Sequence, residues 1–258
     1  MTNILDLPAR KNKPRDSGWT LVLDGGVPTK YFIDALDSYS EYIDFIKFGW
    51  CTSLLTKDIE KKINCALSHD INIFFGGTFF EKALMQGKLD RFYQYHKQLN
   101  CQYMEISNGS IDLDQKEKAR HIKDFSQEFK VLSEVGFKDT QRSLELYPAQ
   151  WIEFMTQDLE AGAVKVIAEA RESGRSGICR ADGELRYGLI SEIIDSSLSM
   201  DEVIFEAPTK TLQVYFTRRL GSDTNLGNIA LSDVLSLETL RLGLRSDTLE
   251  VFEKGIGG

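Results

Sequence analysis

The sequence predicts an α/β protein folded as a single (β/α)8 TIM barrel, and two observations support this architecture. Short apolar runs recur along the chain, and segments of helical period lie between them, about eight times in all. Such an alternation is typical of a closed parallel barrel. In addition, polar residues close one apolar run after another, as Asp24 and Lys47 do. In these barrels the chemistry gathers at the carboxyl ends of the strands, so a site is expected there.

The elements are expected in regular order. Residues 1–18 are polar and should form an arm that leads into a barrel over residues 19–254. Pro148 suits the first turn of the fifth helix. A polar insertion, 171–183, follows the sixth strand, and no linker rich in Gly, Pro and Ser divides the chain. The strands are expected at 19–24, 43–48, 71–75, 102–106, 130–135, 163–169, 203–206 and 224–229. The helices are expected at 31–42, 57–67, 78–85 with 90–99, 115–128, from 148 onward, 185–196, 209–220 and 231–244.

Composition narrows the class of protein. A length of 258 residues is ordinary for one such barrel, and a hydrophobic fraction of 42% supports a large core. The net charge of −8 argues against a nucleic-acid partner. It is compatible with small anionic substrates, because a few cations inside a pocket can dominate the distant field. No stretch has the apolar length of a membrane span or the apolar core of a signal peptide. The four cysteines lack CxxC spacing, which favours a reduced, cytoplasmic protein.

Carboxylates at strand ends are the first candidates for chemistry. Glu105, Glu134 and Glu169 each close an apolar run, and no histidine falls at a strand end. Acids that converge on one pocket repel one another unless a cation or protons intervene. A hard divalent ion such as Mg²⁺ prefers oxygen ligands, so we expect these three residues to form a Mg²⁺ site. The alternative is that each acid forms a salt bridge with a neighbouring strand end.

Cations at the same strand ends are fewer. Lys47 ends the second strand, Lys138 follows the fifth, and Arg171 follows the sixth. A lysine in this position can bind an anion or donate a proton, and these three are the candidate catalytic residues. For Lys138, composition alone favours a solvated loop residue instead. The segment 171–177 contains Arg171 and Arg175 among small residues, which is typical of a lid that reaches a phosphate, although an ordinary surface loop is the alternative.

Two turns resemble anion sites. Asn225, Gly227 and Asn228 precede the final helix, where barrels commonly bind phosphate, so these residues are expected to bind substrate. The segment Gly76-Gly77-Thr78 is similar, but a tight turn with Thr78 as helix N-cap is the favoured interpretation. Three further strand-end residues complete the candidate substrate-binding set: Asp24, Ser107 and Glu206.

In order and spacing, the strand ends resemble the phosphosulfolactate synthase (ComA) family over roughly residues 21–248. The resembling stretches, as they stand here, are VLD at 22–24 with Lys30, YIDFIKFGW at 42–50, GGTFFE at 76–81, EISNG at 105–109, EVG at 134–136, EARESG at 169–174, FEAP at 205–208, NLGNI at 225–229 and LRLGLR at 240–245.

This resemblance implies a TIM-barrel enzyme, a carbon–sulfur lyase acting in the synthetic direction. It implies Mg²⁺-dependent addition of sulfite to phosphoenolpyruvate, giving 2-phospho-3-sulfolactate on the way to coenzyme M or sulfolactate. It also implies a homo-oligomer, expected to be a trimer. Lys138 corresponds to the family lysine that protonates the carbon next to the new bond. Sulfite is a good nucleophile by itself, which suits a site without a histidine base.

Two alternatives stay open at this stage. One is a non-catalytic barrel of the same descent that acts as a stress-associated binding protein. The other is a different phosphoenolpyruvate enzyme that forms an enolate and uses another nucleophile. The presence of Lys138, Glu169, Arg171 and Asn225 together favours the synthase.

Overall fold

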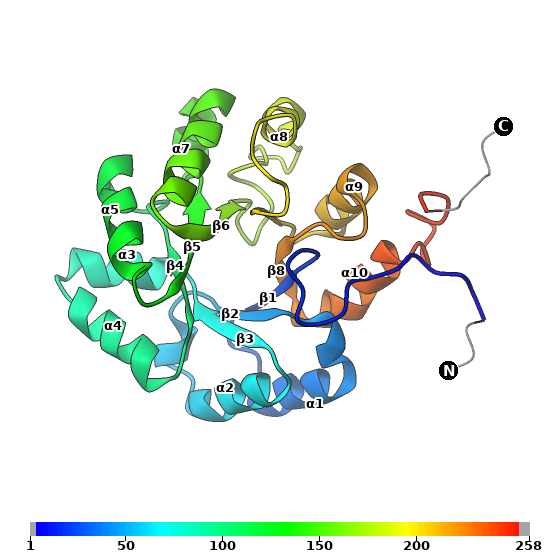
Figure 1. Cartoon of the computed structure of the whole chain (residues 1–258), viewed down its shortest axis with the longest axis horizontal. Coiled ribbons are helices and arrows are strands. Elements are labelled where there is room, and N and C mark those ends of the chain that lie inside the picture. The colour runs from blue at the N-terminus through cyan, green and yellow to red at the C-terminus, as the bar shows by residue number, and fades with distance from the viewer. Residues whose placement is uncertain (1–3, 253–258) are drawn as a thin grey trace.

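The computed structural model describes residues 4–252 and contains eight parallel strands surrounded by helices (Figure 1). The strand order in the sheet is β3-β2-β1-β8-β7-β6-β5-β4. The predicted single (β/α)8 TIM barrel is therefore confirmed, with the sheet nearly closed. The strands are β1 (Thr20–Asp24), β2 (Phe45–Phe48), β3 (Asn72–Phe75), β4 (Tyr103–Ile106), β5 (Lys130–Val135), β6 (Ala163–Ala168), β7 (Val203–Glu206) and β8 (Leu226–Ala230).

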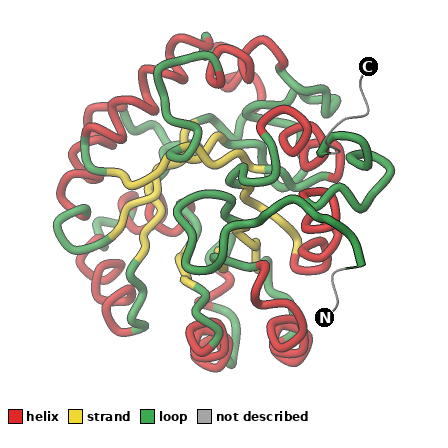
Figure 2. Tube along the Cα trace, turned by 45° about the vertical axis from the view of Figure 1, so that its right-hand side comes forward, coloured by secondary structure: helices red, strands yellow, loops and turns green. Residues whose placement is uncertain are grey.

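The helices form the outer layer, and Figure 2 shows them encircling the strands. They are α1 (Thr29–Tyr39), α2 (Ile59–Ser68), α3 (Thr78–Met85), α4 (Leu89–Gln98), α5 (Gln115–Phe125), α6 (Thr140–Glu145), α7 (Pro148–Glu160), α8 (Tyr187–Ile194), α9 (Lys210–Leu220) and α10 (Val234–Arg241). As expected, Pro148 occupies the first turn of α7. Helix α6 was not expected. It begins where the Asp139 carboxylate accepts a hydrogen bond from the Arg142 amide at 2.9 Å.

Aromatic side chains fill the interior of the barrel on the amino-terminal side of the strand ends. Trp19 lies against Phe45 with ring centroids 4.6 Å apart, and Phe45 meets Tyr103 edge-on at 4.7 Å. Phe74 adds a further edge contact to Phe45. These rings fill the interior below the strand ends, so any pocket must lie above them, at the carboxyl ends of the strands.

The described part of the arm, residues 4–18, is anchored across the amino-terminal end of the barrel. Arg10 forms ion pairs with Asp223, before β8, and with Glu238 of α10. Arg15 pairs with Asp44, which precedes β2, at 3.0 Å. The first three residues of the predicted arm and the last two of the predicted barrel, 253–254, lie outside the described residues.

The barrel has one seam. Within residues 4–252 no ladder of backbone hydrogen bonds joins β3 to β4. One contact across this seam comes from the Cys101 thiol, just before β4, which donates to the Ile73 carbonyl of β3 at 3.1 Å. None of the helices in this part of the chain has the length and apolar character of a membrane span.

Candidate active site

The carboxyl ends of five strands direct charged side chains into one pocket. Each residue follows the alternation of its strand, so its side chain points inward while its neighbours face the helices. All five are buried: Lys47 of β2, Glu105 of β4, Glu134 of β5, Glu169 just after β6, and Glu206 of β7. Lys138 and Arg171, from the loops that follow β5 and β6, also line this pocket. The sequence-predicted acids and cations thus come together at one end of the barrel.

Lys47 lies at the centre of this arrangement. Its ammonium is 2.8 Å from Glu105 Oε2, 3.3 Å from Glu206 Oε1 and 3.4 Å from Glu134 Oε2. Burial by itself would lower the pKa of Lys47, but the three carboxylates outweigh it and raise the pKa well above its ordinary value. The other Glu105 oxygen accepts a hydrogen bond from the Gly77 amide. Lys47 is therefore a fixed positive charge.

Lys138 reaches back over the mouth from the loop after β5. Its ammonium is 3.0 Å from Glu134 Oε1 and 3.8 Å from Glu169 Oε2. Burial opposes its charge, yet the carboxylates of Glu134 and Glu169 together raise the pKa of Lys138 above the ordinary lysine value. Lys138 is therefore protonated in the protein without metal, which is the state that a proton donor needs.

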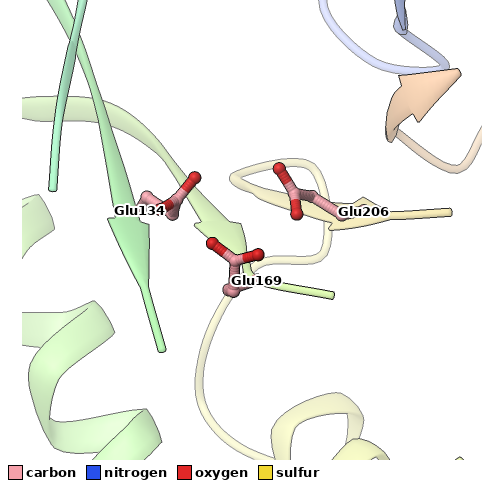
Figure 3. A group of neighbouring side chains, drawn as sticks. All are labelled: Glu134, Glu169 and Glu206. Carbon is pink, nitrogen blue, oxygen red and sulfur yellow. The ribbon is translucent and has the colours of Figure 1, made fainter. Parts of the chain in front are cut away.

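Three glutamates form the acidic wall of the pocket (Figure 3). Glu134, Glu169 and Glu206 each offer a carboxylate oxygen, and these oxygens lie within 4.8 Å of one another. Burial raises the pKa of Glu169 well above its usual value, and Glu134 and Glu206 raise it further. Burial also raises the pKa of Glu206, while the adjacent lysines more than offset burial at Glu134 and lower its pKa. Without a metal, protons relieve the repulsion within this group.

The residues of the pocket fit a divalent cation. Four buried carboxylates face the ammonium groups of Lys47 and Lys138, so full ionisation leaves an excess of two negative charges. One Glu169 oxygen is buried without a hydrogen-bond partner. Hard oxygen donors of this kind are the ligands that Mg²⁺ prefers. The grouped acids include Glu206 in place of Glu105, whose oxygens are taken by Lys47 and Gly77.

Asp24 and Asn225 are among the sequence-predicted residues that the structure places away from the pocket. Asp24 pairs in register with Phe48 and therefore faces the helices, where its carboxylate is 2.6 Å from Lys62 Nζ. Asn225 lies at the opposite end of the barrel. Its side chain accepts from the Trp19 amide at 3.0 Å and donates to the carbonyl groups that lead into β7. Strand β8 begins after Asn225, so the expected mouth position of this residue was wrong.

Four other expected substrate-binding residues differ in access. Asn228 lines the pocket, and its Oδ1 is buried without a partner. Gly227 does not line the pocket; it pairs in register with Glu206, and a Cβ there would lie 3.3 Å from Ile204. Ser107 is fully buried and donates to Glu81 at 2.7 Å, beneath Gly77. Arg175 is exposed and does not line the pocket, whereas Arg171 does, with its guanidinium 3.4 Å from Glu172.

Sequence reasoning missed part of the rim. Gly76, Gly77 and Thr78 line the pocket at the start of α3. Gly77, not Thr78, is the N-cap, and no side chain caps this helix. The adjacent glycines were the available signal, because a Cβ at Gly77 would collide with Ser107. Trp50, with a left-handed backbone and a half-exposed ring against Gly25, is another missed residue.

Comparison of the sequence with known proteins gives a consistent result. A model of the (2R)-phospho-3-sulfolactate synthase (ComA) family matches residues 8–247. A phosphosulfolactate synthase of Bacillus subtilis (strain 168) is 52% identical over 244 residues, which cover 95% of this chain and 97% of the relative. A phosphosulfolactate synthase of Methanothermobacter thermautotrophicus is 42% identical over 246 residues, with 94% and 95% covered.

Solved structures share the fold at much lower identity. A 3-hexulose-6-phosphate synthase has a TM-score of 0.54 at 11% identity and covers 85% of this chain and 98% of its own. The thiamine phosphate pyrophosphorylase of Pyrococcus furiosus has a TM-score of 0.53 at 12% identity, with 92% and 99% covered. At such identities the likeness shows the barrel fold alone.

Proposed function

This chain belongs to the (2R)-phospho-3-sulfolactate synthase (ComA) family, and from that premise we propose the reaction that it catalyses. The reaction is the Mg²⁺-dependent addition of sulfite to phosphoenolpyruvate, giving 2-phospho-3-sulfolactate, by a carbon–sulfur lyase that acts in the synthetic direction. One observation carries the proposal: a buried pocket combines an acidic triad able to bind a cation with a protonated lysine whose ammonium lies 3.0 Å from one triad carboxylate.

The bond changes need little from the protein besides charge and one proton. The sulfur lone pair of sulfite attacks the methylene carbon of phosphoenolpyruvate, and the double-bond electrons move toward the substrate carboxylate. Protonation of the adjacent carbon then completes the product. No side-chain base is required, which agrees with the positions of the three histidines outside the pocket. His69, His96 and His121 lie on or beside helices, away from the strand ends.

Lys138 supplies the proton in this proposal. Its ammonium stands at the rim, 3.0 Å from Glu134, and a long side chain of this kind can extend over a bound substrate. Water entering through the open mouth can return the proton. Lys47, at the floor, is the second candidate cation, but its three carboxylate partners hold it in place.

The cation in this proposal is held by Glu134, Glu169 and Glu206. When bound, Mg²⁺ stabilises the negative charge that develops on the substrate carboxylate. Glu105 instead fixes Lys47 against the start of α3.

The anionic ends of the substrates require donors. Lys47, Arg171 and Asn228 line the pocket and are proposed to bind the phosphate and sulfite groups. Gly227, which pairs with Glu206, is proposed to assist them through its backbone. Arg175 is proposed to join them only if the 171–177 loop closes. Ser107 holds Glu81 in place and acts indirectly.

A direct assay tests the proposal. The protein is incubated with Mg²⁺, phosphoenolpyruvate and sulfite, and the sulfonated product is measured by mass spectrometry, with reactions that lack sulfite or Mg²⁺ as controls. We expect product only in the complete mixture. Absence of product while phosphoenolpyruvate binds would favour the non-catalytic alternative, and consumption of phosphoenolpyruvate without sulfite would favour a different nucleophile.

The setting of the enzyme is also proposed from the family. We expect a cytoplasmic homo-oligomer, a trimer, whose mass light scattering can measure. The four cysteines form no disulfide, which suits a reducing compartment.

A further inference from the structure

A buried polar cluster lies behind β5, on the side of the strand that faces the helices. It consists of Lys118 and Gln115 of α5, Ser133 of β5 and Asp158 of α7. Lys118 and Asp158 are both completely buried, and their charged atoms are 2.8 Å apart. Ser133 donates to the same Asp158 oxygen at 2.7 Å, and Gln115 donates to the other at 2.6 Å. Every charged oxygen in the cluster therefore has a partner.

The cluster is connected to the pocket through the main chain of Glu134. The Lys118 ammonium donates to the main-chain carbonyl of Glu134 at 2.6 Å. The β4–β5 ladder ends with the pair Ile106 and Ser133, one residue before Glu134. The Glu134 carbonyl therefore lies beyond the last residue pair of that ladder, and Lys118 takes the place of a strand partner. The peptide that carries Glu134 is fixed from behind by a charge.

We infer that Lys118 and Asp158 are positioning residues for Glu134, and that they hold its carboxylate where a divalent cation binds. This inference rests on the proposed function, since the cation is that of the acidic triad. Groups beyond the direct ligands commonly orient them, and losing one such group costs about 10–100-fold in metal affinity. A buried ion pair adds little stability compared with well-packed apolar side chains, which leaves orientation as its specific contribution.

The chain contains a matched control. Lys62 of α2 is equally buried, pairs with Asp24 at 2.6 Å and donates to the Val27 carbonyl. It lies behind β1, where the inward residue at the pocket is Leu23 and not a carboxylate. Lys62→Met therefore removes the same chemical group from the same layer without touching a strand that carries a triad residue.

The test is calorimetric titration of the purified full chain with Mg²⁺, repeated with Mn²⁺, alongside circular dichroism. We expect Lys118→Met to stay folded and to raise the Kd for the cation about 10–100-fold. Lys62→Met should change the Kd for the cation less than about twofold. Its thermal unfolding midpoint, followed by circular dichroism, should fall by about as much as that of Lys118→Met. Asp158→Asn should also raise the Kd for the cation. This variant is used in place of Lys118→Met if Lys118→Met does not fold.

The outcomes separate the two proposals. Unchanged Kd in a folded Lys118→Met or Asp158→Asn protein overturns the positioning role, and so does an equal loss in Lys62→Met. If the wild-type protein binds neither cation, the metal assignment itself fails, and the positioning inference fails with it.

Discussion

The Lys138 ammonium lies 3.0 Å from Glu134 Oε1 and 3.8 Å from Glu169 Oε2, so the candidate proton donor touches two members of the candidate metal triad. A cation bound by those carboxylates would draw their charge away from Lys138. The raised pKa of this lysine would then fall toward its ordinary value. Metal binding and readiness to donate a proton are thereby joined through shared oxygens.

Replacing Lys138 tests its role directly. Lys138→Met should keep the fold and much of the phosphoenolpyruvate binding while reducing kcat by about 10²–10⁴-fold, as expected for a positioned proton donor. Lys138→Arg should also be poor, because a guanidinium hardly gives up a proton. Steady-state kinetics and substrate titration measure both effects, with the exposed Lys123→Met as control. Near wild-type turnover in Lys138→Met would transfer the role to Lys47.

The metal set can be tested by comparing two buried glutamates. Glu206→Gln should raise the Kd for Mg²⁺ by about tenfold or more, because it removes one oxygen donor of the triad. Glu105→Gln should have a smaller effect on Kd, since Glu105 is bound to Lys47 and Gly77. Exhaustive chelation should abolish activity, and added Mg²⁺ should restore it. Full activity after chelation, or a larger effect from Glu105→Gln, would contradict the assignment.

Gly177 should tolerate no side chain. Its φ is +67°, and a Cβ there would collide with the Glu169 main chain. The left-handed backbone alone costs about 1–2 kcal/mol for other residues, and the collision adds to this. We expect Gly177→Ala to lower stability in urea unfolding and to reduce activity by displacing Glu169. Gly188→Ala is the control, because open space surrounds Gly188 in α8, and it should be neutral or stabilising by up to about 1 kcal/mol.

His96 should make stability depend on pH. It is fully buried, and burial lowers its pKa from 6.5 to about 4. The folded protein therefore binds fewer protons than the unfolded chain between these values. The contribution of neutral His96 to the free energy of unfolding is complete above pH 6.5. It is lost as the pH falls toward 4, a decrease of about 3 kcal/mol in all. Urea unfolding of wild type and His96→Leu at pH 4 to 8 measures the difference, which should shrink toward acid. A constant difference would contradict the buried neutral state.

The barrel was predictable from sequence because strands buried on both sides give apolar runs, each closed by a polar residue at its functional end. The same reasoning placed Lys47, Glu105, Glu134, Glu169 and Glu206 at one end, where the structure has them. Their roles remain predictions. Helix α6 escaped detection because six residues are too few to establish a helical period.

The errors come from effects that operate across space. Asp24 ends a strand like the others, but its partner Lys62 is 38 positions away, and only the register shows that it faces outward. Asn225 and Asn228 read as parts of one polar turn before the final helix, but β8 begins between them at Leu226, so Asn225 lies at the amino-terminal end of the strand and Asn228 faces the pocket. Membership of Glu206 in the triad depends on the lateral order of β5, β6 and β7.

The seam between β3 and β4 is held together by side chains of the pocket itself. Lys47, on the β2 side, forms an ion pair with Glu105 on β4, and the Gly77 amide just beyond β3 donates to the same carboxylate. These bonds bridge the one edge where a backbone ladder is missing from the described strands. Breathing of the barrel along this edge would pull the pocket apart, and a ligand held there would resist it. A related protein in which Lys47 or Glu105 is replaced to acquire new chemistry would need another way to hold β3 against β4.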